Sequence, residues 1–345
     1  MVAEHYLKGL EKSPGYTQML PNSWADYIEL VCLANIDGEV SVEDMIDRLA
    51  GRVKDLREDS AEALEELDKL EKESEDDVQP SRRAEVSDKW DTRVISYFKV
   101  LSLRHQLYGD DYPFIVKDDC IFAKKILGDN NLLYIYLLLC SNLYLFDDET
   151  RNDLANSFEL ICFNAFQKLL PQDSISYLFG KNPLNKRGRY SRGTFWEKLK
   201  KLTLELNEKM NAHVKKSDYS EYNTGDDGLD LVGWLPTRDK LPSSIIHFAQ
   251  CACTYDFETK QHSSGHYDWL QKISFKNLPL NSTFIPHCYR RADGTWINVT
   301  KIKFTFLIDR RRILNFYDDS RKIQFKKLPI FSIVKNISNL KENVI

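Results

Sequence analysis

The sequence predicts an α+β fold, in which a helical N-terminal region precedes an α/β domain with a mixed central sheet. Residues 84–171 carry apolar residues at helical spacing, whereas short β-branched and aromatic runs bounded by Gly, Pro and Asp follow residue 225. From residue 194 the expected order is helix, strand, strand, helix and strand, which fits a three-layer α/β core. We therefore divide the chain into a helical region at 1–177 and an α/β domain at 178–345.

The composition excludes several classes of protein. A chain of 345 residues with 42% hydrophobic residues can form one large core or two, and its net charge of −4 leaves nucleic-acid contacts to local basic patches. Seven cysteines lie scattered among apolar residues, which indicates reduced thiols and a cytoplasmic location. The longest apolar run, 131–140, is too short to span a bilayer, and no signal peptide is evident, so we expect no membrane partner.

The first part of the helical region contains an acidic segment. Residues 58–77 predict a strongly acidic helix with one thin apolar stripe of leucines. The simplest interpretation is a solvated charged face, and the alternative is packing against another helix or another subunit in a homo-oligomer.

The second part predicts an extended link at 111–116 and helices at 117–126, 131–146 and 148–170. Glu159 lies among apolar residues on the last of these helices. A helical carboxylate there can face solvent or an arginine, so we assign it no catalytic role. A helical block of this kind more often serves docking, dimerisation or target sensing than chemistry.

A basic segment opens the α/β domain. Its cations are Lys181, Lys186, Arg187, Arg189, Arg192, Lys198, Lys200 and Lys201, with Tyr190, Phe195 and Trp196 among them. Cations in a glycine-containing loop before a helix suit phosphate contacts, which dominate affinity for nucleic acids. The alternative is a solvated loop and helix face. A helix is expected at 194–214, and Glu197 is the only acid within the basic segment.

Two strands are predicted at 225–234 and 245–254. Side chains alternate across a strand, so Asp230 shares one face of the first strand with Val232, and Gln250 shares one face of the second with Phe248. If the strands are neighbours, Asp230 and Gln250 converge, and two oxygen donors on rigid strands suit a hard cation such as Mg²⁺. The simpler alternative is a turn at 225–228, with Asp230 satisfied by local amides.

The run Gly228-Leu-Asp-Leu-Val232, followed by Gln250-Cys-Ala252, resembles the PD-(D/E)xK (restriction-endonuclease-like) nuclease superfamily, in particular bacterial defence-associated members. The resemblance covers roughly residues 185–315 and implies a three-layer restriction-endonuclease-like domain. Its first strand would lie within 215–224. The superfamily's strand acid and the next strand's Asp, Glu or Gln match Asp230 and Gln250.

The resemblance also implies a set of site residues. Asp230 and Gln250 would hold Mg²⁺ or Mn²⁺ together with the carbonyl of Cys251, and Glu197 would contribute a carboxylate from the first helix. The lysine expected two positions after Gln250 is replaced by Ala252. Its role would pass to Lys272 of the run Trp269-Leu-Gln-Lys272, with Lys260 as the second candidate. Four cations would contact DNA, namely Arg187, Arg189, Arg192 and Lys198.

The function implied is a Mg²⁺-dependent DNA endonuclease that hydrolyses phosphodiester bonds in bacterial anti-phage defence, with protein partners from a multi-gene system. The alternative is a catalytically inactive nuclease fold that binds nucleic acid or a protein partner in a defence complex. A zinc site among the nearby His and Cys residues is less favoured. Cys251 and Cys253 on one strand place their sulfurs about 7 Å apart, which exceeds the spacing around one zinc ion.

Overall fold

The computed structural model describes residues 10, 21–48, 79–254 and 256–339. The predicted acidic helix at 58–77 lies outside these residues. The chain forms two compact units. The first comprises Met1–Gly128, Arg291–Thr295 and Ile337–Ile345, and the second comprises Asp129–Arg290 and Trp296–Asn336. The predicted boundary at 177/178 lies inside the second unit, because the helix at 148–169 packs on the central sheet of that unit.

The first unit combines helices with a small antiparallel sheet. Its helices are α1 (Pro21–Ala34) and α4 (Gln79–Tyr108), followed by the short η3 (Gly109–Asp111). Its strands β1 (Glu39–Ser41), β2 (Phe114–Lys117) and β3 (Cys120–Ala123) pair in the order β1-β3-β2.

The prediction of a helix at 117–126 is wrong, because β2 and β3 form a hairpin there. Its two turn residues, Asp118 and Asp119, both have positive φ (51° and 60°). That conformation suits a two-residue hairpin turn and interrupts a helix.

The second unit begins with α5 (Asp129–Cys140), η4 (Leu143–Leu145), α6 (Asp148–Leu169), β4 (Ile175–Leu178), η5 (Pro183–Asn185), α7 (Phe195–Glu205), β5 (Lys209–Met210) and η6 (Lys216–Asp218). Next come β6 (Leu231–Trp234), β7 (Ile246–Cys251), α8 (Phe257–Lys260), α9 (His266–Leu270), β8 (Ile273–Ser274) and β9 (Leu280–Phe284). The last elements are η7 (Val299–Lys301), β10 (Phe306–Ile308), α10 (Arg310–Phe316), η8 (Phe325–Lys327) and α11 (Ile330–Ser338).

The central sheet of the second unit is mixed, as the α+β prediction requires. Its five strands lie in the order β10-β9-β7-β6-β4. Strand β6 is antiparallel to both of its neighbours, β4 and β7, whereas β7, β9 and β10 run parallel. A second, two-stranded sheet pairs β5 with β8.

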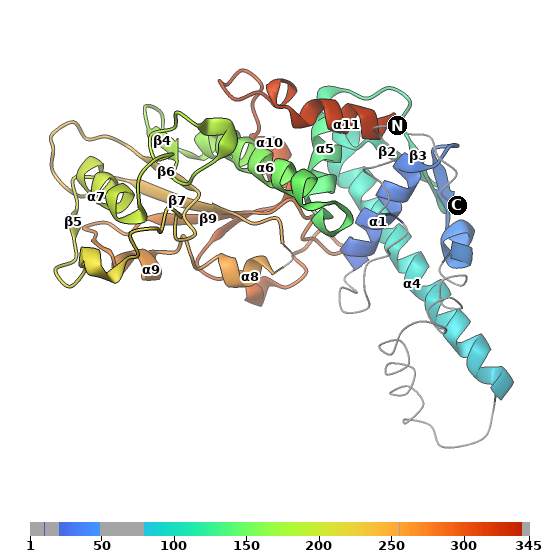
Figure 1. The fold of residues 1–345 in the computed structure, drawn as a ribbon. Coiled ribbons are helices and arrows are strands. Elements are labelled where there is room, and N and C mark those ends of the chain that lie inside the picture. Colours follow the sequence, from blue (N-terminus) through green and yellow to red (C-terminus); the bar gives the residue numbers. More distant parts are fainter. Residues whose placement is uncertain (1–9, 11–20, 49–78, 255, 340–345) are drawn as a thin grey trace. The chain divides into compact units, whose positions relative to one another are not determined.

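Helices cover both faces of the central sheet, which gives three layers (Figure 1). On one face α6 packs over β6 and β7, where a Cβ added to Gly233 would come within 2.6 Å of the Leu170 side chain just beyond the helix. On the other face Phe248 of β7 lies 5.2 Å from the Trp269 ring of α9, within a core that includes Phe195 of α7. The predicted α/β core is therefore present.

Several predicted elements have other bounds. The first strand of the sheet is β4, at 175–178, and 215–224 instead contains η6 and turns. The helix predicted at 194–214 ends at Glu205, because Asn207 adopts a positive φ of 55°, which terminates helices. The last strand of the sheet, β10, spans only 306–308, since the Asn298 side chain accepts a hydrogen bond from Thr300 N–H and begins η7.

Candidate functional site

Asp230 and Gln250 meet where β6 and β7 lie side by side. The register pairs Leu231 with Ala249, so Asp230, one residue before β6, is placed opposite Gln250. The Asp230 N–H donates to the Ala249 carbonyl at 3.1 Å, and its Oδ2 accepts a hydrogen bond from the Cys251 N–H at 2.7 Å. One carboxylate oxygen is therefore bound to the β7 backbone directly after Gln250.

The Gln250 side-chain amide faces two backbone carbonyls. Its amide faces the carbonyls of Lys260 and Gly228, and with its nitrogen turned towards them it donates to both, at 3.3 Å in the case of Gly228. Gly228 has a φ of +77°, and a Cβ there would collide with the Ser263 side chain. This orientation commits the amide nitrogen to the loops and leaves the amide oxygen as the atom that could bind a cation.

Two further carboxylates complete the cluster, and sequence reasoning assigned a role to neither. Glu159 reaches the site from α6, where its Oε2 accepts a hydrogen bond from Asn182 Nδ2 at 2.8 Å. Asp226 precedes Asp230 in the β6 loop, and its Oδ1 accepts a hydrogen bond from the Gly228 N–H at 3.0 Å. The chain approaches closely here, since a Cβ on Gly180 would lie 2.5 Å from Asp226 Oδ2.

The three carboxylates, Glu159, Asp226 and Asp230, interact as like charges. Burial, together with the Asp226 charge and against the Asn182 hydrogen bond, raises the pKa of Glu159 to about 7. Burial and the charges of Glu159 and Asp226 raise the pKa of Asp230 well above its usual range, against the Cys251 N–H and the Lys260 ammonium. All three side chains are half-buried. A cation bound by Glu159 and Asp230 would therefore compete with protons for these two carboxyl groups.

Lys260, at the end of α8, is the lysine whose charge acts on Asp230. Lys272, the first choice from the sequence, points elsewhere. It forms an ion pair of 2.8 Å with Asp227, donates to the Asp268 carbonyl at 3.2 Å and lies 5.0 Å from the centre of the Trp269 ring. Its ammonium is thus paired with Asp227 rather than with Asp230, a partner in the acidic loop that the Trp-x-x-Lys spacing did not reveal.

Glu197 does not join the cluster either. It is exposed at the start of α7, where its Oε2 accepts a hydrogen bond from the Thr194 N–H and its own N–H donates to Thr194 Oγ1. This reciprocal pair is a capping box, which occupies the carboxylate locally. The helix that contributes a carboxylate is α6, and the signal in the sequence was an acid between the apolar residues Phe158 and Leu160.

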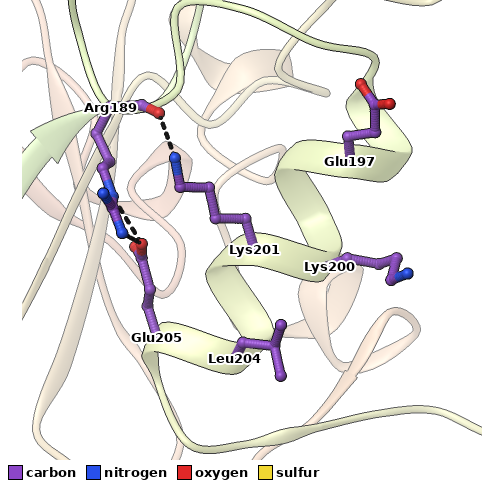
Figure 2. A pocket seen from close by; sticks show the side chains of 6 residues that line it. All are labelled: Arg189, Glu197, Lys200, Lys201, Leu204 and Glu205. Carbon is purple, nitrogen blue, oxygen red and sulfur yellow. Dashed lines mark hydrogen bonds and ion pairs between the residues drawn. The ribbon is translucent and has the colours of Figure 1, made fainter.

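The four cations predicted to contact DNA have different surroundings. Arg187 and Arg192 are exposed. Arg189 is paired with Glu205 and lines an open pocket of about 430 Å³ on α7 together with Glu197, Lys200, Lys201 and Leu204 (Figure 2). Lys198 is buried and donates to the carbonyls of Thr224 and Gly225 at 2.7 and 3.1 Å. Its role is structural, because it holds the loop that leads to Asp226.

Three of the nearby cysteines and histidines, Cys251, Cys253 and His247, pack against other interior groups. Burial raises the pKa of the Cys251 thiol, which lies beside Cys162 of α6, and Cys253 lies beside Cys140 of α5. Burial lowers the pKa of His247 to about 4, and its Nε2 lies 2.7 Å from Ser282 Oγ. In the described parts of the chain no group of three or more His, Cys, Asp or Glu side chains could hold a metal ion.

No family model matches the sequence, and neither a curated protein nor a solved structure matches the chain. Within the residues that the structure describes, every helix is too short or too polar to cross a bilayer.

Proposed function

We propose that the Asp230 site is the active site of a divalent-metal-dependent nuclease that hydrolyses phosphodiester bonds in DNA. The observation that carries the proposal is the cluster of Glu159, Asp226 and Asp230. It comes from two segments of one unit and lies beside Gln250 and Lys260, and among the described residues none of its three carboxyl groups forms a salt bridge. The mixed central sheet, with helices on both faces, supports the proposal because it gives the Asp230 site a rigid α/β scaffold.

The donor set fits Mg²⁺ or Mn²⁺ better than a softer metal. It consists of carboxylates and the Gln250 amide oxygen, which are hard oxygen ligands. Mg²⁺ is commonly held by one or two carboxylates plus water and substrate phosphate, so it does not require three protein carboxylates around one point. Asp230 and Glu159 are the two best placed to hold it. When bound, the metal would polarise the phosphate and generate a water-derived nucleophile.

The chain's own residues prepare this chemistry. The Cys251 N–H fixes one oxygen of Asp230 and leaves the other for a ligand. Gln250 is held by loop carbonyls, so its oxygen is positioned before substrate arrives. Lys260 is exposed, and its ammonium can approach a phosphate and offset the charge that builds on it during hydrolysis.

The test is cleavage of labelled DNA with Mg²⁺ or Mn²⁺ by the full chain and by Asp230→Ala. We expect the parent to cleave and Asp230→Ala to be inactive while remaining folded. The matched control is Asp227→Ala, which removes a neighbouring acid that pairs with Lys272. It should retain activity. A parent that cleaves neither single nor double strands with either metal contradicts the proposal, as does an active Asp230→Ala.

The second candidate function is a nucleic-acid- or protein-binding subunit without catalysis. Ala252 stands where the resemblance expects the lysine, and it is buried, so it provides no functional group there. This candidate predicts DNA or partner binding without cleavage under the same conditions. The wider assignment to bacterial defence, with protein partners from a multi-gene system, follows from the sequence resemblance, and the cytoplasmic location follows from the scattered cysteines.

A further inference from the structure

An exposed cluster of aromatic rings lies beside the proposed active site. It consists of His266 and Tyr267 on α9 and Phe304 in the loop before β10. The Tyr267 and Phe304 side chains are 59% and 69% exposed. The rings of His266 and Tyr267 lie 4.2 Å apart, and Phe304 stands nearly perpendicular to both, at 6.0 and 5.7 Å. The three rings therefore form an open corner on the surface.

The loop that carries Phe304 is held rigidly. The buried Gln261 side chain donates to the Lys301 carbonyl at 2.8 Å and accepts from the Lys303 N–H at 2.9 Å. The buried Asn281 side chain donates to the Phe304 carbonyl at 3.3 Å. The ring is thus presented to solvent by a buried polar network, which fixes its position better than a flexible loop would.

The backbone of Phe304 is also strained. Its φ is +52°, a left-handed conformation that a bulky residue adopts rarely and at a cost. Burial of the Phe304 ring does not compensate for that strain, because most of the side chain faces solvent. A strained residue that exposes an aromatic ring indicates a surface that gains its stabilisation from a ligand.

The cluster lies within reach of the active site. Asn281, which holds Phe304, pairs with Phe248 on β7, two residues from Gln250 and one strand away. This corresponds to about 7 Å along the strands and about 5 Å across them. Gln261, which holds the loop at Lys301 and Lys303, directly follows Lys260. A strand that passes Lys260 would therefore reach the aromatic corner.

Cations flank the rings of this segment on both sides in the sequence. Lys301 and Lys303 precede Phe304, and the Arg312 guanidinium lies 4.8 Å from the centre of the half-exposed Phe306 ring. Aromatic faces beside cations are what proteins use to bind the bases and phosphates of single-stranded nucleic acid. A duplex keeps its bases stacked on one another, so it offers no free base face to the corner.

We propose that His266, Tyr267 and Phe304 form a stacking platform for an unpaired base of a single-stranded nucleic acid next to the Asp230 site. This deepens the proposed function and rests on it for the identity of the ligand. The platform selects strands with unpaired bases, and Lys303 supplies a phosphate contact beside it.

The test measures binding by fluorescence anisotropy in EDTA, so that cleavage does not enter. The probes are a labelled oligo(dT) and a labelled duplex. We expect the double variant Tyr267→Leu/Phe304→Leu to bind oligo(dT) about tenfold more weakly or worse, with duplex binding unchanged, because a stacked base contributes on that scale. Leucine keeps the surface apolar but removes the ring. The matched control is Tyr222→Leu, a 92% exposed tyrosine outside the cluster, which should bind like the parent.

The salt dependence separates stacking from charge. The ring variants should retain the parent's slope of log affinity against log salt concentration. Lys303→Gln should reduce the magnitude of that slope by about one, which corresponds to the loss of one phosphate contact. Equal loss on duplex and oligo(dT), or no loss on either, overturns the proposal. So does a parent that binds no oligo(dT), which would leave a protein partner as the ligand of the rings. A protein that binds oligo(dT) through the rings but cleaves no DNA contradicts the proposed nuclease activity and leaves the stacking platform supported.

Discussion

The surface of α7 and the end of the β6–β7 pair are both rich in charge, but the charges have opposite arrangements. On α7, Glu205 pairs with Arg189 of the preceding loop, and Lys201 donates to the Arg189 carbonyl at 2.9 Å (Figure 2). At the strand ends Glu159, Asp226 and Asp230 gather with one sign, and among the described residues none of the three forms a salt bridge. The charges on α7 satisfy one another within the fold. Carboxyl groups gathered without a cationic partner are instead typical of a functional site, where a ligand supplies the opposite charge.

The largest expected effect is on DNA cleavage and distinguishes the two lysines Lys260 and Lys272. Lys260→Ala should lower Mg²⁺-dependent cleavage by about a hundredfold or more, the scale of losing one group that stabilises the transition state. Lys272→Ala is the matched control and should cleave nearly like the parent, because its ammonium is paired with Asp227. Cleavage rates at saturating metal measure both. The reverse ranking would return the catalytic role to Lys272.

The next effect is the pH dependence of stability caused by Glu159. Its pKa is raised from 4.5 to about 7 in the folded chain, so between these values the folded state binds more protons than the unfolded state. Stability from this group is therefore complete below about pH 4.5 and is lost as pH rises through about 7, by at most about 3 kcal/mol.

Glu159→Gln should lack this loss, since it keeps an oxygen for Asn182 but no charge. Urea unfolding of parent and variant without metal, from pH 4.5 to 8, measures the difference. The variant should gain stability relative to the parent as pH rises. Parallel curves across this range would show that Glu159 is already ionised and neutralised in the folded chain.

A smaller effect tests the lysine whose role changed. Lys198→Met removes two hydrogen bonds to the Asp226 loop and should lower the free energy of unfolding by about 1–2 kcal/mol. The salt slope of DNA binding should not change, because buried Lys198 does not reach phosphate. Lys200→Met, on the exposed side of the same helix, should leave stability unchanged. If Lys198→Met instead lowers the salt slope of DNA binding and leaves the free energy of unfolding unchanged, Lys198 is a DNA contact.

The sequence was most informative where a short-range pattern decides the structure. Alternation along two strands predicted that Asp230 and Gln250 share a face, and the register of β6 and β7 agrees. The mixed sheet with helices on both faces also followed from the order of the elements.

The missing parts depend on distant packing. Glu159 lies on a helix 71 residues before Asp230, counted from their positions, and helical spacing does not show which sheet edge a helix side chain will reach. Spacing also does not determine the partner of a long cationic side chain. Lys198 was assigned to DNA and Lys272 to catalysis beside Asp230, whereas the structure pairs them with loop carbonyls and with Asp227. A four-residue edge strand such as β4 carries too little pattern to be distinguished from a loop.

The central claim is that Glu159 and Asp230 form a cluster which a divalent cation completes. Its most direct test is the stabilisation of the folded chain by Mn²⁺ at pH 8, compared between parent, Asp230→Asn and the control Asp227→Asn. At a Mn²⁺ concentration about a hundredfold above Kd, the parent and Asp227→Asn should each gain about 2.7 kcal/mol in the free energy of unfolding, and Asp230→Asn should gain little. The gain should shrink at pH 5, where protons compete for the carboxylates. A parent that Mn²⁺ does not stabilise, or an Asp230→Asn variant stabilised equally, would contradict the claim.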